Sequence, residues 1–229
     1  MSIVGLQKMT LLDYPGRVAC TVFLSGCNFR CPFCHNAEIC DPHAEPLLTE
    51  DELLAFLKKR VGLLDGVVLT GGEPLMTPEL PELIRKIRAL GYPVKLDTDG
   101  YWPDRLAPLL DEHLLDYIAM DIKNDPDRYA LTCGVEYVDL SRIRESIRLI
   151  MNSGIGYEFR TTVVDQLHDE KSFEGIGEMI SGAGHYYLQA FHDRDTVVFS
   201  GLSAPDRGKM ERYAACAASR VLSVELRGI

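Results

Sequence analysis

The chain lacks any long apolar run and any leader-like N-terminus. No stretch reaches the roughly 18–20 consecutive apolar residues that a membrane-spanning helix needs, and no basic segment precedes an apolar core and a cleavage site. It also has no low-complexity linker and no internal repeat that would mark a domain boundary. These absences predict a soluble, cytoplasmic protein folded as a single domain over residues 1–229.

Positive charge is scarce as well. Lysine and arginine number 24 against 34 aspartates and glutamates, so the formal net charge is −10, and no basic patch appears in the sequence. A negative balance of this size repels polyanions, which argues against a general nucleic-acid binder. The hydrophobic content of 46% in 229 residues is enough to bury a sizeable core.

Cysteine is present in a number and an arrangement that do not suit a disulfide framework. There are seven cysteines, and Cys27, Cys31 and Cys34 form a CxxxCxxC set after a strand-like apolar run. An odd number with one cluster favours a reducing compartment. Three thiolates are one fewer than a closed zinc site or a fully ligated iron–sulfur cluster usually takes. The motif therefore predicts a metal centre with one position open for a substrate or cofactor.

The competing interpretations are three cysteines that simply pack and a zinc site with a fourth protein ligand. His35 follows Cys34 directly, and this short connection leaves it little freedom to act as the fourth ligand of a tetrahedral zinc site. Cys40 lies six residues after Cys34 and could supply that ligand. Cys40 is thus the main rival to an open site.

Strand-like runs alternate with helical patterns along the chain. Strands are predicted at residues 18–25, 66–70, 94–97, 117–122, 157–164, 186–191 and 221–226. A capping box of Thr49 and Glu52 predicts the start of the first helix, and Thr77 that of the second; further helices are predicted at 140–150, 104–112, 169–181 and 206–218. Strands separated by helices pair in parallel through right-handed crossovers. The predicted fold is α/β, a partial (βα)6 barrel with a parallel sheet.

Polar groups follow the predicted strands where each strand ends. In parallel α/β folds such groups collect at the carboxyl edge of the sheet. They are the cysteine set, Thr70-Gly-Gly-Glu-Pro74, Asp97-Thr-Asp-Gly100, Asp121 with Lys123, Arg160, and Gln189 with His192. One site over the barrel mouth explains all of them together.

These residues resemble the radical S-adenosylmethionine (SAM) enzymes, and within them the activating enzymes of glycyl radical proteins. The cysteine motif with Phe33 before its third cysteine and His35-Asn36 after it is highly specific for that group, and Gly-Gly-Glu-Pro at 71–74 is a second matching motif. Residues 10–17 and 24–30 are most similar to anaerobic ribonucleoside-triphosphate reductase activating proteins. The resemblance implies a radical SAM core domain over 1–229, with an N-terminal arm at 1–16 and a cluster loop at 26–40.

The resemblance also implies roles for the strand-end residues. Cys27, Cys31 and Cys34 would hold a [4Fe–4S] cluster whose free iron binds SAM. The remaining expected cofactor-binding residues are Phe33 near the adenine, Gly71 and Gly72 at the methionyl amino group, Glu73 as a structural hydrogen-bonding group, and His35 and His192. Asp97, Thr98 and Asp121, together with the Ala119 carbonyl, would hold a monovalent cation beside the SAM carboxylate. Lys123 and Arg160 would face that carboxylate or the ribose, and the alternative for each is a salt bridge inside the barrel.

The implied activity is cleavage of SAM to a 5′-deoxyadenosyl radical that takes a hydrogen atom from a glycine of a partner enzyme. Anaerobic ribonucleotide reductase is the expected partner, a flavodoxin or ferredoxin type protein the expected reductant, and no nucleic acid or membrane is expected. Two alternatives remain: a radical SAM enzyme for a small molecule, such as a deazapurine synthase, and a non-catalytic zinc or iron–sulfur module. The roles of Asp99, which stands where relatives often have asparagine, and of Cys133 are left open.

Overall fold

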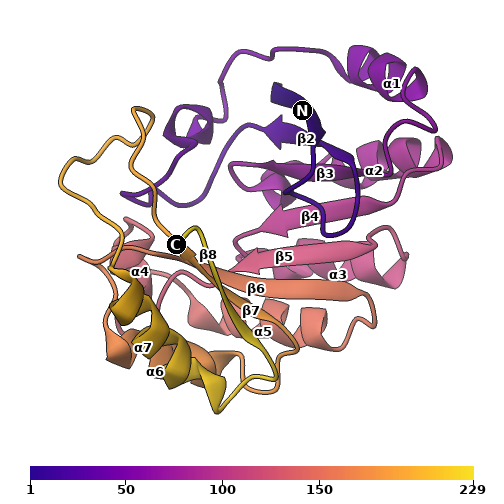
Figure 1. Cartoon of the computed structure of the whole chain (residues 1–229). Helices are drawn as coiled ribbons and strands as arrows, with labels where there is room; N and C mark the ends of the chain where they lie inside the picture. Colours follow the sequence, from indigo (N-terminus) through magenta and orange to yellow (C-terminus); the bar gives the residue numbers. More distant parts are fainter.

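The computed structural model describes residues 1–229 and is built on one eight-stranded sheet whose strands follow one another in sequence order (Figure 1). The strands are β1 (Ile3–Thr10), β2 (Ala19–Leu24), β3 (Gly66–Gly71), β4 (Val94–Thr98), β5 (Tyr117–Asp121), β6 (Gly156–Val163), β7 (Tyr186–Ala190) and β8 (Val224–Arg227). β1 pairs with β2 in antiparallel fashion, and every other neighbouring pair is parallel.

Helices fill the connections between the parallel strands. They are α1 (Glu50–Lys58), α2 (Leu80–Ala89), α3 (Pro103–Asp111), α4 (Tyr129–Thr132), α5 (Leu140–Met151), α6 (Glu170–Met179) and α7 (Arg207–Ala218), with short 3₁₀ turns at Ala37–Cys40 and Pro74–Met76. The predicted capping box is present, because the Thr49 hydroxyl accepts from the Glu52 amide and the Glu52 carboxylate accepts from the Thr49 amide. It satisfies two amides that the first helical turn leaves without partners.

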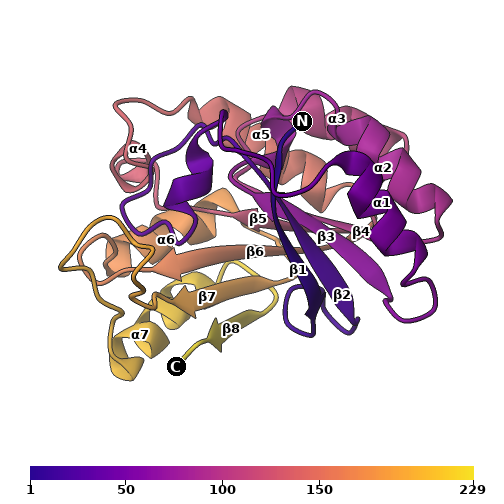
Figure 2. The same ribbon diagram turned by 90° about the horizontal axis from the view of Figure 1, so that it is seen from above.

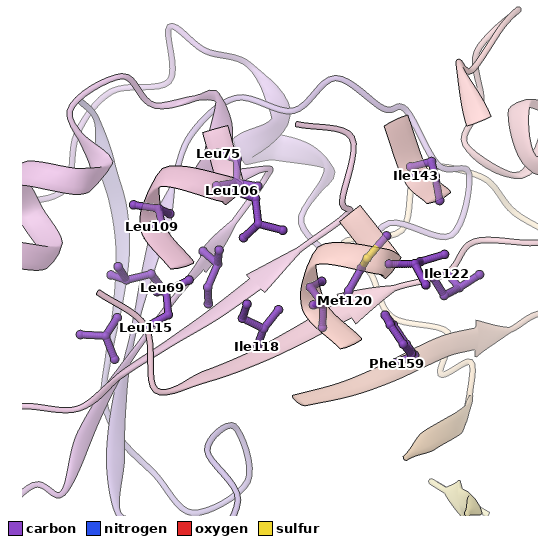
Figure 3. Close-up of a cluster of buried hydrophobic side chains, with 14 of the residues drawn as sticks. Leu69, Leu75, Leu106, Leu109, Leu115, Ile118, Met120, Ile122, Ile143 and Phe159 are labelled. Carbon is purple, nitrogen blue, oxygen red and sulfur yellow. The ribbon is translucent and has the colours of Figure 1, made fainter. Parts of the chain in front are cut away.

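The sheet is curved, and its two edge strands do not meet. Figure 2 shows β1 and β8 on opposite sides of an opening, with the helices outside the curve of the sheet. On that outer side Ile118 and Met120 of β5 join an apolar cluster with Leu106 of α3 and Ile143 of α5 (Figure 3). Successive side chains of a strand point to opposite faces, so Ala119 and Asp121 lie on the inner face. The apolar core thereby directs the polar strand-end residues into the mouth of the partial barrel.

The predicted α/β class, parallel sheet and single domain are confirmed, with differences in detail. β1 was not predicted, because an edge strand of mixed polarity shows no clear apolar alternation. The second helix begins at Leu80 rather than at Thr77, which has an extended backbone with ψ of 112°. A residue that precedes proline, as Thr77 precedes Pro78, disfavours the helical region. None of the helices has both the length and the apolar character that a membrane crossing requires.

Candidate functional site

The cysteine loop, residues 26–40, follows β2, and backbone hydrogen bonds join its two ends. The Gly26 amide donates to the Ile39 carbonyl at 2.9 Å, and the Cys27 amide donates to the Cys40 carbonyl at 3.2 Å. Within the loop, the Cys34 amide donates to the Cys31 carbonyl at 3.0 Å. These bonds form a closed loop that presents its three cysteines to a pocket with a volume of about 190 Å³.

Two further cysteines lie against these three. Hydrogen bonds with the thiols of Cys27 and Cys34 raise the pKa of Cys40, and the bond from Cys40 lowers the pKa of Cys34 to about 6. In the same way a hydrogen bond with Cys133 lowers the pKa of Cys31, while burial raises the pKa of Cys133. A lowered pKa favours the thiolate, which is the form that ligates metals.

The donor set of the loop fits an iron–sulfur cluster. The three thiols come from one loop and line one pocket, and clusters of this kind are held by cysteine thiolates. No three His, Cys, Asp or Glu side chains are arranged as the ligands of one metal ion. The Cys31 thiol lies beside that of Cys133, and the Cys34 thiol beside that of Cys40. The assignment of Cys27, Cys31 and Cys34 as the three ligands stays a prediction.

The Gly-Gly-Glu-Pro turn after β3 packs directly on the base of the cysteine loop. A Cβ atom at Gly71 would lie 2.1 Å from the Leu24 carbonyl oxygen, and one at Gly72 would lie 2.0 Å from the Gly26 carbonyl oxygen. Gly71 also has a positive φ of 134°, which side-chain-bearing residues rarely adopt. The turn thus needs glycine in order to approach this closely. The Glu73 amide completes the contact by donating to the Gly26 carbonyl at 2.7 Å.

Glu73 is fully buried and joins the ends of β3 and β4. Its carboxylate accepts from the Leu75 amide at 2.9 Å, the Thr98 hydroxyl at 2.8 Å and the Asp99 amide at 2.6 Å. Burial raises the pKa of Glu73 well above its ordinary value, and the charge of Asp99 adds to this effect. The expected structural role of Glu73 agrees with these bonds, since Glu73 does not line the pocket.

Asp99 does line the pocket and connects it to the cysteine loop. Its carboxylate accepts from the Asn28 side chain at 3.0 Å and from the Tyr101 amide at 2.9 Å, and the Trp102 indole donates to the Asn28 side-chain oxygen at 3.1 Å. Burial raises the pKa of Asp99. The Asp99 carboxylate is therefore tied to Asn28, the residue that follows Cys27.

Two aspartates and two cationic side chains, Arg160 and Lys123, lie on the opposite wall of the pocket, and a third cationic side chain, Lys95, pairs with this wall without lining the pocket. Arg160 lies between Asp97 and Asp121, with its Nη2 atom 3.1 Å from the first carboxylate and its Nε atom 2.7 Å from the second. Lys95 pairs with Asp97, and Lys123 pairs with Asp121 at 3.0 Å. Burial by itself would raise the pKa of Asp121, but the charges of Arg160 and Lys123 outweigh burial and lower it.

This wall does not support the expected monovalent cation. Every oxygen atom of the Asp97 and Asp121 carboxylates already has a cationic nitrogen beside it. The alternative considered for these residues, a salt-bridge network inside the barrel, is present. The network does not remove Lys123 and Arg160 from the pocket, which both still line.

The aromatic residues of the motif line the pocket and contact Phe191, the residue that follows β7. Phe33 belongs to a small apolar cluster with Val164 and Phe191, and His35 stacks on Phe191 with ring centroids 5.6 Å apart. The His35 ring also hydrogen-bonds the His192 carbonyl oxygen at 2.6 Å. The His192 side chain is exposed and does not line the pocket. His192 thus acts here through its backbone.

The pocket brings together all the predicted site residues except Glu73, Gln189 and His192. The Gln189 side chain is exposed on β7. The pocket also includes residues that were not assigned to it from the sequence, which are Phe29, Asn36, Cys40, Thr70, Asp99 and Thr162. Lys95 was missed and the role of Cys133 was left open; neither residue lines the pocket. A lysine within an apolar strand, two residues before Asp97 and on the same face, is a signal that could have revealed Lys95.

The comparison with protein families shows which family the chain belongs to. Residues 21–176, more than half of the chain, match the Radical SAM superfamily. The matched segment contains the cysteine loop, the Gly-Gly-Glu-Pro turn and the strand ends through Arg160. The chain therefore belongs to the radical SAM superfamily and is an enzyme of the radical SAM type.

Individual relatives are similar over most of the chain. A Methanocaldococcus jannaschii protein, provisionally named as a glycyl-radical enzyme activating enzyme, is 28% identical over 235 residues, with 99% of this chain and 96% of that protein aligned. The pyruvate formate-lyase-activating enzyme of Clostridium pasteurianum is 30% identical over 175 residues, covering 74% of this chain and 71% of that protein.

Among solved structures, a domain of a pyruvate-formate lyase-activating enzyme from Bacteroides vulgatus superposes with a TM-score of 0.56 at 20% identity, covering 71% of this chain and 99% of the other. At this identity the likeness shows the fold alone.

Proposed function

We propose that this protein is an activating enzyme for a glycyl radical enzyme. The observation that carries the proposal is the similarity along 99% of the chain to the provisionally named activating enzyme of M. jannaschii. The pyruvate formate-lyase-activating enzyme of C. pasteurianum, similar over 74% of the chain, supports the same class. We further propose anaerobic ribonucleotide reductase as the partner, on the motifs at residues 10–17 and 24–30.

In this proposal the cysteine loop holds a [4Fe–4S] cluster and the adjoining pocket holds SAM. When bound, the two together supply one-electron cleavage of the sulfonium and a 5′-deoxyadenosyl radical that takes a hydrogen atom from a glycine Cα. The protein would hold the cluster and SAM in position relative to each other. Gly72 and Glu73 fix the turn against the cysteine loop, and Lys123 and Arg160 give the opposite wall positive charge that suits the SAM carboxylate.

The shape of the barrel supports a protein substrate. β1 and β8 lie at free edges rather than pairing with each other, so the inner face is open on one side (Figure 2). A glycine on a partner enzyme has to reach the pocket on a segment of chain, which an open barrel permits. Because the chain has a net charge of −10, docking would rest on local contacts rather than broad electrostatic attraction, and moderate salt should not abolish activation.

The proposal includes an electron donor and a location. A flavodoxin or ferredoxin type protein would reduce the cluster, and both partners would be cytoplasmic. Seven free cysteines, with no disulfide among them, suit a reducing compartment.

The test combines the reconstituted protein, SAM and a chemical reductant with the anaerobic ribonucleotide reductase of the same organism. Electron paramagnetic resonance should detect a glycyl radical doublet on the reductase, and 5′-deoxyadenosine should form with it. The matched control is a Cys31→Ala variant, which should give neither product because one cluster ligand is missing.

Two outcomes would contradict parts of the proposal. A doublet on another glycyl radical enzyme, with none on the reductase, would reassign the partner but keep the class. If 5′-deoxyadenosine formed with no glycyl radical on any such enzyme, the activating function itself would be wrong, and a small-molecule substrate would take its place.

A further inference from the structure

Each carboxylate oxygen of the two aspartates on the pocket wall is paired with a cationic nitrogen. Asp97 uses one oxygen for Lys95 Nζ and the other for Arg160 Nη2, which lies 3.1 Å away. Asp121 uses one oxygen for Arg160 Nε at 2.7 Å and the other for Lys123 Nζ at 3.0 Å. Each of the four oxygens therefore faces a positively charged nitrogen.

The neighbouring hydroxyl is committed in the same way. Thr98 donates its hydroxyl hydrogen to the Glu73 carboxylate at 2.8 Å, and its oxygen accepts from the Gly100 amide at 3.0 Å. Glu73 is fully buried, so this bond turns the hydroxyl away from Asp97 and toward the end of β3. Thr98 thus does not offer its oxygen to the space between the aspartates.

Hard cations such as K⁺ and Na⁺ need several oxygen ligands. The expected cation site would have drawn them from the side chains of Asp97, Thr98 and Asp121 and from the Ala119 carbonyl. All the oxygens of these three side chains accept hydrogen bonds or ion pairs from donors of this chain, which leaves only the Ala119 carbonyl. A cation between the aspartates would also lie against the Arg160 guanidinium, which carries the same charge. The residues present therefore do not fit a bound monovalent cation.

We propose that Arg160 takes the place of such a cation in this protein. Its guanidinium holds Asp97 of β4 and Asp121 of β5 together, and this pairing aligns Lys123 along the pocket. Asp121 and Arg160 are register partners on adjacent parallel strands, so the sheet itself sets the position of the bridge. Arg160 is a positioning residue, and SAM binding is independent of K⁺ and Na⁺. The inference rests on the proposed use of this pocket for SAM.

The experiment titrates SAM into the reconstituted protein by calorimetry in potassium, sodium and tetramethylammonium chloride at equal ionic strength. Tetramethylammonium is too large to enter a site of this kind. The wild-type dissociation constants should agree within about twofold in the three salts. In an Arg160→Gln variant, SAM should bind at least fivefold more weakly in tetramethylammonium than in potassium, because a small cation can then occupy the space between the aspartates.

A matched control is Arg88→Gln. Arg88 also bridges to an aspartate, Asp116, which lies just before β5 at the opposite end of that strand from the pocket. Its removal should leave SAM affinity the same in all three salts. An Arg160→Lys variant should fall between wild type and Arg160→Gln, since it keeps the charge but cannot span both carboxylates.

A second measurement does not depend on the cluster or on SAM. The melting temperature of the cluster-free wild-type protein should be the same in potassium chloride and in tetramethylammonium chloride. That of cluster-free Arg160→Gln should be higher in potassium chloride. Should that variant fail to fold, the wild-type titrations decide the question.

Wild-type SAM affinity at least tenfold weaker in tetramethylammonium than in potassium would overturn the inference while leaving the SAM pocket intact. If wild type bound no SAM in any salt, the proposed function would be wrong and the inference would fall with it.

Discussion

A Gly72→Ala substitution tests whether the contact between the Gly-Gly-Glu-Pro turn and the cysteine loop holds the site in place. Gly72 has no positive φ, so alanine can adopt its backbone conformation. The added Cβ would, however, lie 2.0 Å from the Gly26 carbonyl oxygen and 3.1 Å from the Cys27 Cβ. The oxygen belongs to the backbone and cannot rotate away, so the turn and the cysteine loop must separate.

Such overpacking costs about 1–3 kcal/mol of unfolding free energy. For a domain of this length each kcal/mol shifts the melting temperature by about 2–4 °C, so we expect a fall of about 2–12 °C in the cluster-free protein. The displaced loop should also bind less iron and sulfide after anaerobic reconstitution. Gly184→Ala is the control, since the nearest atom to its added Cβ is the Tyr157 hydroxyl at 3.7 Å. It should melt at or slightly above the wild-type temperature.

Thermal melting followed by circular dichroism and colorimetric iron and sulfide assays provides both readouts. The reasoning would be refuted if Gly72→Ala had the same melting temperature as the Gly184→Ala control and bound a full cluster. A fall in melting temperature with normal cluster content would show that the contact supports the fold without positioning the cysteines.

Three further predictions follow from the same contacts. Alanine at Cys27, Cys31 or Cys34 should abolish iron binding, whereas Cys40→Ala should change it little; equal loss in Cys40→Ala would show a fourth ligand. Asp121→Ala should weaken SAM binding about tenfold in calorimetry without loss of iron, and unchanged affinity with a large fall in melting temperature would assign Asp121 a structural role only. Because the pKa of Asp121 is below its ordinary value of 3.8, its ionisation stabilises the fold above about pH 4, and this contribution is lost as pH falls. Urea unfolding from pH 7 to pH 3 should therefore show the stability difference between wild type and Asp121→Asn shrinking below pH 4, and a constant difference would contradict this.

The fold could be predicted where local signals and the global fold agree. The central strands are short apolar runs bounded by turns, and Thr49 with Glu52 defines a helix start by local hydrogen bonds alone. β1 lacked such a signal, since its place is decided by pairing with β2, from Ile3 opposite Leu24 to Thr10 opposite Ala19. Pairing between distant segments is not visible in either segment alone.

The site could be predicted as a set of residues but not as a network. Strand ends of a parallel sheet meet at one edge, so Asp97, Asp121 and Arg160 could be placed together from order alone. Which of them bond to each other depends on strand register and on Lys95, whose side chain is only 1% exposed. The resemblance to the family therefore implied a cation between the aspartates, with a salt bridge as the alternative, and the structure has an arginine there. The role of Cys133 could not be predicted for a similar reason, because its position beside Cys31 depends on how the segment after β5 folds back.

The closed base of the cysteine loop has a thermodynamic consequence for loading a cofactor. Fixing the backbone of one residue costs about 1–2 kcal/mol in conformational entropy, so ordering the fifteen residues from Gly26 to Cys40 costs on the order of 15–30 kcal/mol. The hydrogen bonds that pair Gly26 with Ile39 and Cys27 with Cys40 mean that folding, rather than cofactor binding, meets most of this cost. A cofactor that arrives at the folded chain needs to order only side chains, so its binding free energy is retained as affinity.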